Sequence, residues 1–87
     1  MIKSAFTKKH ETLRFLLVRA RKEANLTQVQ LARKLARPQS FVSKFERGER
    51  RLDVVEFLEV TSAIGIDPIR FLQTLKDGQV TSKKSSL

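Results

Sequence analysis

The sequence predicts a compact all-α domain of five helices, and two observations support this. Apolar residues recur with the period of a helix through most of the chain, and no alternating run of Val, Ile and Thr typical of a strand is present. Signals for helix starts and ends divide the 87 residues into a few segments. The expected helices are residues 8–24, 28–36, 39–47, 54–64 and 68–76.

Three of these helices have a clear start signal. Thr27 is followed three residues later by Gln30, and Asp53 is followed in the same way by Glu56. Both patterns are capping boxes, in which the two side chains satisfy backbone N–H groups at the start of a helix. The Asp67-Pro68 pair offers a capping carboxylate followed by proline at the first helical position.

The helix ends are marked by residues that tolerate a left-handed backbone. Gly48, Gly65 and Gly78 each follow a segment with helical periodicity. Asn25 can end the first helix in the same way, because asparagine also adopts this conformation readily. These stops predict where the first, third and fourth loops and the C-terminal tail begin.

Helical spacing then predicts which apolar side chains form one core. The expected core residues are Leu13, Leu17, Ala20, Ala24, Val29, Leu31, Ala32, Leu35, Val42, Phe45, Phe57, Leu58, Ile64, Leu72 and Leu75. A further set is left over in a domain of this size: Phe15, Val18, Phe41, Val55, Ile69 and Phe71. These residues either cover the core edges or form a subunit contact.

The net charge of +9 is concentrated in the first part of the chain. Residues 1–51 hold 14 Lys and Arg against 4 acidic residues, whereas residues 52–87 hold 4 against 5. This asymmetry indicates a polyanionic partner, with nucleic acid ahead of an anionic membrane. A charged surface that only aids solubility is the alternative on charge alone.

Several classes of protein are not expected from the composition. Cysteine is absent, which excludes disulfides and cysteine-based metal sites and favours a reducing cytoplasm. Neither a long apolar run nor a secretory signal is found, so no membrane association is expected. The one histidine, His10, is expected to be solvated, and no carboxylate pair suits acid–base chemistry. Hence we expect no enzyme activity, no metal and no cofactor.

The chain divides into three parts. Residues 1–9 form a basic N-terminal arm, residues 10–76 form the folded domain, and residues 77–87 form a polar tail that is expected to be disordered.

The second and third expected helices are short and separated only by Ala36, Arg37 and Pro38. So tight a connection makes two helices cross steeply, which is the helix-turn-helix arrangement. The outer face of the third helix would then present Gln39, Ser40, Ser43, Lys44 and Arg47.

Some of these side chains suit the edges of DNA bases. Gln39 can bond adenine, Lys44 can donate to guanine, and Ser40 can donate or accept. Phe41 could contact a thymine methyl group, or it could instead pack on the edge of the second helix. For Ser43 and Arg47 a phosphate contact or a solvated position is favoured over base reading.

The segment LTQVQLARKLARPQSFVSKFERGERRLDVVEFLEVTSAIGIDP resembles the phage-repressor (Cro/repressor, or XRE) helix-turn-helix family. The ordered motifs are LTQ at the start of the second helix, LA within it, Phe45-Glu46 in the third, and RG at its end. The resemblance covers residues 13–76. It implies a compact five-helix repressor-type helix-turn-helix domain that binds double-stranded DNA.

The resemblance also implies roles for particular residues. Gln39, Ser40 and Lys44 match base-reading positions, and Gln28 matches a glutamine that bonds a phosphate and braces the first reader. Arg21 and Glu46 match a structural ion pair between the first and third helices. The remaining expected phosphate contacts are Ser43, Arg37, Arg47, Arg50 and Arg51.

Two residues depart from the family pattern. Ala36 stands where glycine is usual, so a left-handed Ala36 would cost about 1 kcal/mol. Pro38 stands where Ser or Thr is frequent, which removes a capping hydroxyl but presets φ for helix entry.

Family members usually bind near-palindromic sites as homodimers, with recognition helices about 34 Å apart. The residues expected at the dimer interface are Pro68, Ile69, Arg70 and Phe71. Phe71 could alternatively close the core together with Ile66.

The expected function is a transcriptional regulator, with repression favoured, in the bacterial or phage-infected cytoplasm at the nucleoid. An antitoxin, a restriction-modification controller and a mobile-element repressor all stay open, as does control by a small protein partner. The competing class is a protein-interaction adaptor with the same fold. The polar outer face of the third helix disfavours it, because an adaptor has no need of base-reading side chains.

Overall fold

The computed structural model describes residues 7–78 as five helices joined by short loops, with no strand in that range. The helices are α1 (Lys8–Glu23), α2 (Gln28–Leu35), α3 (Gln39–Arg47), α4 (Val54–Ile64) and α5 (Pro68–Asp77). The predicted all-α, five-helix fold is therefore confirmed, and each helix boundary lies within one residue of the prediction.

The predicted arm (1–9) and the predicted disordered tail (77–87) lie largely outside the described residues. Within the part that is described, Lys8 and Lys9 already belong to the first turn of α1, and Asp77 belongs to α5. The folded domain thus begins earlier than the expected residue 10. His10 also lies in α1, where its backbone N–H donates to the capping Thr7 Oγ1 at 3.1 Å.

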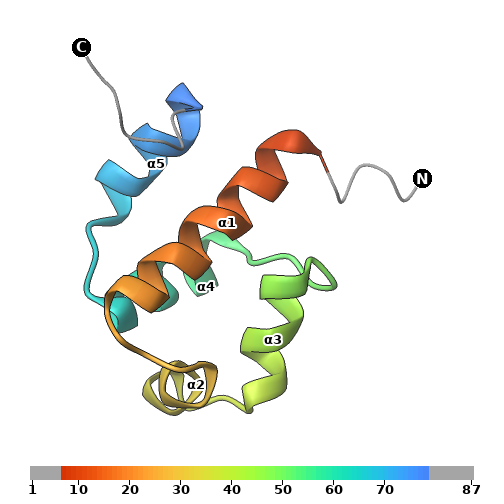
Figure 1. Cartoon of the computed structure of the whole chain (residues 1–87), viewed down its shortest axis with the longest axis vertical. Coiled ribbons are helices and arrows are strands. Elements are labelled where there is room, and N and C mark those ends of the chain that lie inside the picture. The colour runs from red at the N-terminus through yellow and green to blue at the C-terminus, as the bar shows by residue number, and fades with distance from the viewer. Residues whose placement is uncertain (1–6, 79–87) are drawn as a thin grey trace.

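The longest helix, α1, crosses the middle of the molecule, and the others are arranged around it (Figure 1). Helix α3 lies on one side of α1 and α5 on the other, while α4 lies behind it and α2 lies below its C-terminal end in this view. Of residues 7–78, none form a helix with the length and apolar character needed to span a membrane.

Both predicted capping boxes are present, which explains why α2 and α4 begin where they do. Thr27 Oγ1 accepts from the Gln30 N–H at 3.0 Å, and Gln30 Oε1 accepts from the Thr27 N–H at 2.9 Å. Asp53 and Glu56 repeat this reciprocal pairing at the start of α4, at 2.7 and 3.0 Å. The two boxes differ in charge, because the first pairs Thr27 with Gln30 and the second pairs two carboxylates, Asp53 and Glu56.

The expected helix stops are also left-handed. Asn25, Gly48, Gly65 and Gly78 all have positive φ angles. Gly48 has a second reason to be glycine, because a Cβ there would lie 2.9 Å from the guanidinium carbon of Arg14.

The core is smaller than the periodicity predicted. Its buried apolar residues are Leu16, Leu17, Leu31, Ala32, Phe41, Val42, Phe45, Phe57, Val60 and Ile64. Four residues predicted to be buried are exposed: Ala24, Val29, Leu58 and Leu72. Leu16, Phe41 and Val60 were not among those predicted. The buried stripe of α4 passes through Val60 and Thr61 rather than through Leu58, because α4 packs against α2 and α5 with the face that carries the former two residues.

Ala36 adopts the left-handed conformation at φ 57° and ψ 41°, where a Cβ is unfavourable. We therefore expect Ala36→Gly to raise the free energy of unfolding by about 1 kcal/mol, measured by urea denaturation followed by circular dichroism. Ala24→Gly is the matched control, because Ala24 also ends a helix but has φ −85°. Ala24→Gly relieves no backbone strain and should lower the free energy of unfolding, because glycine adds conformational freedom to the unfolded chain. Equal effects of the two substitutions would contradict a strained Ala36.

Candidate nucleic-acid interface

Helices α2 and α3 are joined by a three-residue turn, Ala36 to Pro38. The left-handed Ala36 reverses the chain, and the Arg37 N–H donates to the Ala32 carbonyl at 3.0 Å. Pro38 precedes α3 with φ −65° and forms no side-chain cap, as its chemistry predicts. This turn produces the helix-turn-helix crossing expected from the spacing.

Helix α3 is strongly two-sided. Its inner face is buried and consists of Phe41, Val42 and Phe45. Its other face carries the polar side chains predicted to meet DNA: Gln39, Ser40, Ser43, Lys44 and Arg47. All of these are exposed except Ser43, which is half-buried and donates from Oγ to the Ser40 carbonyl at 3.4 Å.

A buried ion pair joins α1 to α3, between the two residues that the resemblance indicated. Arg21 donates to both carboxylate oxygens of Glu46, from Nε at 2.7 Å and from Nη2 at 3.0 Å. The two side chains are only 10% and 7% exposed. Arg21 Nη1 also donates to the Leu26 carbonyl at 2.8 Å, which ties the α1–α2 loop to the same group. Each charge therefore has several partners, as a buried ion pair requires.

The same carboxylate extends to the first predicted base reader. Gln28 Nε2 donates to Glu46 Oε1 at 2.8 Å, and Gln28 Oε1 accepts from Gln39 Nε2 at 3.2 Å. A continuous chain of polar contacts thus runs from Arg21 through Glu46 and Gln28 to Gln39. It orients the amide of Gln39: the NH2 group donates to Gln28, so the carbonyl oxygen of the same amide faces the other way.

Arg14 was not predicted to have a role, yet it supports the end of α3. Its Nη1 donates to the Glu46 carbonyl at 3.1 Å, close to Gly48. A positive side chain at this place also complements the helix dipole. The sequence carried no signal for it, because α1 has several basic residues and nothing local distinguishes this one.

Phe41 is in the core and is not placed to read a base. The residue is 8% exposed, and its ring packs edge-on against Phe45, with centroids 5.5 Å apart. The guanidinium carbons of Arg37 and Arg50 lie 4.4 and 4.8 Å from the ring centroid. Of the two predicted alternatives, packing is therefore the one observed, and the ring is not available for the predicted contact with a thymine methyl group.

Both of these arginines are held by carboxylates of α4. Arg50 donates to Glu56 through two parallel bonds, at 2.9 and 2.7 Å, and Arg37 lies 3.8 Å from the same carboxylate. The hydrogen bonds from Arg50, then that from the Asp53 N–H, lower the pKa of Glu56 to about 2. Glu56 is therefore ionised throughout the physiological range. The capping box had marked this residue, but it gave no sign of the arginines.

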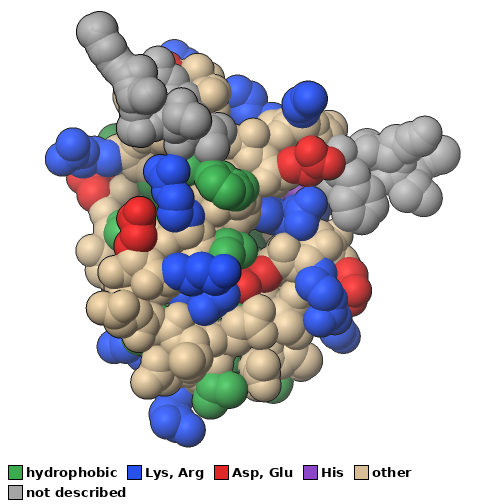
Figure 2. Space-filling view, viewed as in Figure 1, with side chains coloured by type: hydrophobic (Ala, Val, Ile, Leu, Met, Phe, Trp, Pro, Cys, Tyr) green, Lys and Arg blue, Asp and Glu red, His purple; other side chains and the backbone are tan. Residues whose placement is uncertain are grey.

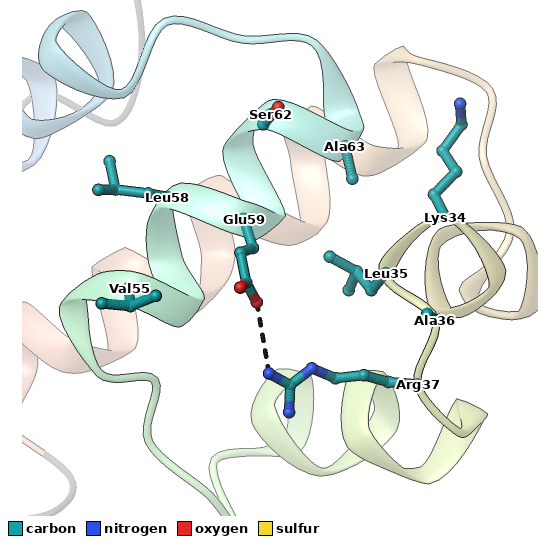
Figure 3. Close-up of a pocket in the computed structure, with 9 residues that line it drawn as sticks. All are labelled: Lys34, Leu35, Ala36, Arg37, Val55, Leu58, Glu59, Ser62 and Ala63. Carbon is teal, nitrogen blue, oxygen red and sulfur yellow. Dashed lines mark hydrogen bonds and ion pairs between the residues drawn. The ribbon is translucent and has the colours of Figure 1, made fainter.

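Arg37 also reaches a second acid across an open groove between α2 and α4. Its Nη2 lies 3.3 Å from Glu59 Oε1, and Figure 3 shows this pair spanning the groove. The groove has a volume of about 760 Å³ and is lined partly by Leu35, Val55 and Leu58. Arg37 is thus tethered by Glu56 and Glu59 rather than presented alone to solvent.

The other predicted phosphate contacts are more open. Arg47 pairs with Glu49 at 3.0 and 3.1 Å, but both side chains are more than half exposed, at 56% and 52%. Such a pair is weak and easily displaced. Arg51 is exposed. On the face in Figure 2, lysine and arginine side chains are scattered, and several lie beside acidic ones, so they form no single continuous patch.

The N-terminal part of α1 contributes a neutral group to this basic region. Partial burial, followed by the nearby charges of Arg51 and Arg14, lowers the pKa of His10 below its usual value. His10 is half-buried rather than fully solvated, which differs from the prediction. Residues 7–78 contain no group of three or more His, Cys, Asp or Glu arranged to hold a metal ion.

The predicted dimer residues of α5 divide into two kinds. Ile69 is 67% exposed, and Arg70 is exposed beside it. Phe71 instead packs against the core, with its ring 5.4 Å from that of Phe57. Pro68 is half-buried. The exposed apolar surface of this helix comes from Ile69 together with Leu72, which the sequence had assigned to the core.

Comparisons with known proteins agree with this geometry. A helix-turn-helix family model matches residues 17–71. The chain is similar to the solved structure of an XRE-family like protein from Pseudomonas syringae pv. tomato str. DC3000, with 48% identity and a TM-score of 0.79 over 82% of this chain and 87% of that one.

A second solved structure, a mutant of the restriction-modification controller protein C.Esp1396I, has a TM-score of 0.76 over 88% of this chain and 98% of that one. At 21% identity it shows the shared fold alone. No functionally curated protein matches the chain.

The buried ion pair leads to a stability prediction. Arg21→Met or Glu46→Gln leaves an unpaired buried charge or an unsatisfied guanidinium, so each should lower the free energy of unfolding by about 3 kcal/mol or more. Urea denaturation measures this loss. Arg19→Met is the control on the same helix, because Arg19 is 42% exposed and lies 3.9 Å from Glu23. Its effect should stay below about 1 kcal/mol. A loss as large for Arg19 as for Arg21 would show that burial of the pair is unimportant.

Proposed function

The chain belongs to the phage-repressor (Cro/repressor, XRE) helix-turn-helix family of DNA-binding transcription regulators, and we propose that it is a repressor that binds a near-palindromic operator as a homodimer. The site of action would be the cytoplasm of a bacterial or phage-infected cell, at the nucleoid. The observation that carries the proposal is the polar face of α3, whose first residue is already oriented through Gln28.

In this proposal α3 lies in the major groove, and Gln39, Ser40 and Lys44 contact base edges. All three are exposed; Ser40 and Lys44 lie on the face of α3 opposite the buried Val42, whereas Gln39 lies in the first turn, three residues before Val42. Gln39 lies at the N-terminal end of α3, the end that approaches the bases in helix-turn-helix proteins. Its contact with Gln28 reduces the conformational freedom that it would lose on binding.

Phosphate contacts would supply most of the affinity, and Gln28, Ser43, Arg47 and Arg51 are the proposed donors. Gln28 lies at the first position of α2, where helix N–H groups also favour an anion. A phosphate can displace Glu49 from Arg47, because that ion pair is exposed. Arg37 and Arg50 differ from these residues, since carboxylates of α4 already hold them.

Base reading by α3 can be tested by selecting binding sites from a random duplex pool. Gln39→Ala and Lys44→Ala should each weaken binding to the selected site by about 1–3 kcal/mol and relax the choice of base at one position of each half-site. Fluorescence anisotropy on the selected duplex and on single-base variants gives both quantities.

Gln73→Ala and Lys76→Ala are matched controls, because they remove the same side chains from exposed positions of α5. They should leave the choice of site unchanged. Wild-type site choice in both α3 variants would show that α3 is not the reading helix.

The proposed homodimer uses the exposed part of α5. Ile69 is the central contact, because it is the most exposed large apolar side chain of this helix, with Arg70 at the rim. Phe71 does not contact the partner in this proposal; it supports the interface by packing α5 against Phe57 of α4. Two recognition helices joined in this way would meet half-sites about one DNA turn apart.

Ile69→Ser tests this interface. The variant should bind a duplex with two half-sites at least tenfold more weakly, a loss of at least about 1.4 kcal/mol, while its affinity for a single half-site is unchanged. Analytical ultracentrifugation of the protein with each duplex measures stoichiometry and affinity. Val29→Ser, an exposed apolar residue of α2, is the control and should keep two protomers on the duplex. Wild-type stoichiometry and affinity for Ile69→Ser would remove α5 from the interface.

A further inference from the structure

Glu56 joins more parts of the domain than a helix cap needs to. Its Oε1 accepts from the Asp53 N–H at 3.0 Å and from Arg50 Nη1 at 2.9 Å. Its Oε2 accepts from Arg50 Nη2 at 2.7 Å and lies 3.8 Å from Arg37 Nη1. The side chain is 12% exposed. One carboxylate thus connects the turn before α3, the loop after α3 and the first turn of α4.

The two arginines are held at both ends of the recognition helix. Arg37 lies in the turn that leads into α3, and Arg50 follows the end of α3 by three residues. Three of the five N–H donors of Arg50 are used within the domain, because its Nη1 also donates to the Arg51 carbonyl at 2.8 Å. Both guanidiniums lie over the Phe41 ring, a favourable place for a cation.

This arrangement differs from the exposed ion pair of Arg47. Glu49 is 52% exposed, so water competes for it, whereas the carboxylate of Glu56 is largely shielded and makes parallel bonds. Parallel guanidinium–carboxylate bonds are among the stronger and more directional contacts in proteins. Glu56 therefore occupies Arg50 in the way that a DNA phosphate would.

We propose that Glu56 is a positioning residue that sets the specificity of DNA binding by restraining Arg37 and Arg50 from non-specific contact with the DNA backbone. Non-specific affinity grows with the number of phosphates that basic side chains neutralise, whatever the sequence. Because two arginines beside α3 are restrained, fewer phosphates are neutralised on any sequence, and base contacts then determine which site is bound most tightly. Glu56 can act in this way only if α3 reads DNA as proposed.

Glu56→Gln separates this role from helix capping. The chain itself shows that glutamine suffices at the equivalent capping position, since Gln30 completes the box of α2. The substitution should therefore retain α4, which a circular-dichroism melt can verify, while it removes the charge that holds the arginines. Affinities are then measured for the duplex selected by the wild-type protein and for a scrambled duplex of the same length and composition, between 50 and 200 mM salt.

The expected result is tighter binding to the scrambled duplex. Each released arginine that meets a phosphate should steepen the slope of log affinity against log salt by about 0.9, so the total change is about 1 to 2. The ratio of affinities for selected and scrambled duplexes should fall by at least about threefold. The added phosphate contacts should strengthen binding to the scrambled duplex more than binding to the selected one.

Asp77→Asn controls for net charge. It changes the charge by the same amount at the exposed end of α5, which lies across α1 from α3 (Figure 1), and should leave the slope within about 0.3 of wild type. The double variant Glu56→Gln/Arg50→Gln tests the mechanism. Its slope of log affinity against log salt should be less steep than that of Glu56→Gln by about 0.9, because Arg50 is no longer present to bind a phosphate.

The outcomes are distinguishable. Selective wild-type binding together with an unchanged slope and ratio in Glu56→Gln would overturn the role of Glu56 and leave the proposed reading by α3 intact. A flatter slope in Glu56→Gln would also overturn it, because Glu56 would then be presenting the arginines to phosphate. Failure of the wild-type protein to select any duplex would overturn both proposals.

If Glu56→Gln does not fold, Arg50→Gln alone decides the question. An arginine already occupied by Glu56 adds little to binding, so its removal should flatten the slope by less than about 0.3. A loss of about 0.9 would show that Arg50 binds phosphate freely, and the proposal would fail.

Discussion

The position of α3 depends first on the buried pair of Arg21 and Glu46. Burial of two charges in a domain this small is expensive unless each is fully satisfied, and the structure supplies those partners from three elements. Arg21 anchors the pair in α1 and bonds the Leu26 carbonyl, while Glu46 brings α3 to it and also accepts from Gln28. Any shift of α3 along α1 would break several of these bonds at once. The geometry of α3 against the rest of the domain is therefore discrete rather than adjustable, and Gln39 receives its orientation from the same network.

A second carboxylate, Glu56, acts on the other side of the same helix. Glu46 and Phe41 are five positions apart in α3, which places them about 140° apart around the helix axis. The first side is held to α1 and α2, and the second side is held to α4 through the arginines that cover Phe41. Polar contacts thus flank an apolar base made of Val42 and Phe45. A short helix has little stability of its own, so the helical structure and orientation of α3 depend on these lateral contacts and on its buried face.

Much of the fold could be predicted because its signals are local. A capping box, a proline at the first turn and a glycine after the last turn act within a few residues, so the boundaries of the helices followed from the sequence. The buried faces were harder. Leu58 and Val60 fit two overlapping helical stripes of α4, and the choice between them depends on where α2 lies. Leu72 was misplaced and Phe41 stayed undecided for the same reason, since an apolar residue at the edge of a stripe is buried only if a neighbouring element reaches it.

The sequence by itself determined the five helices, the steep turn between α2 and α3, and the polar character of the outer face of α3, because these properties depend on residue type and short-range spacing. The tertiary structure alone decided what each basic residue does. In the sequence, Arg37, Arg47, Arg50 and Arg51 look alike, and each could meet a phosphate. The fold gives Arg50 a shielded carboxylate and Arg47 an exposed one, and it brings Arg14 to the end of α3. The strength of an ion pair depends on burial and on geometry between distant segments, which spacing along the chain does not contain.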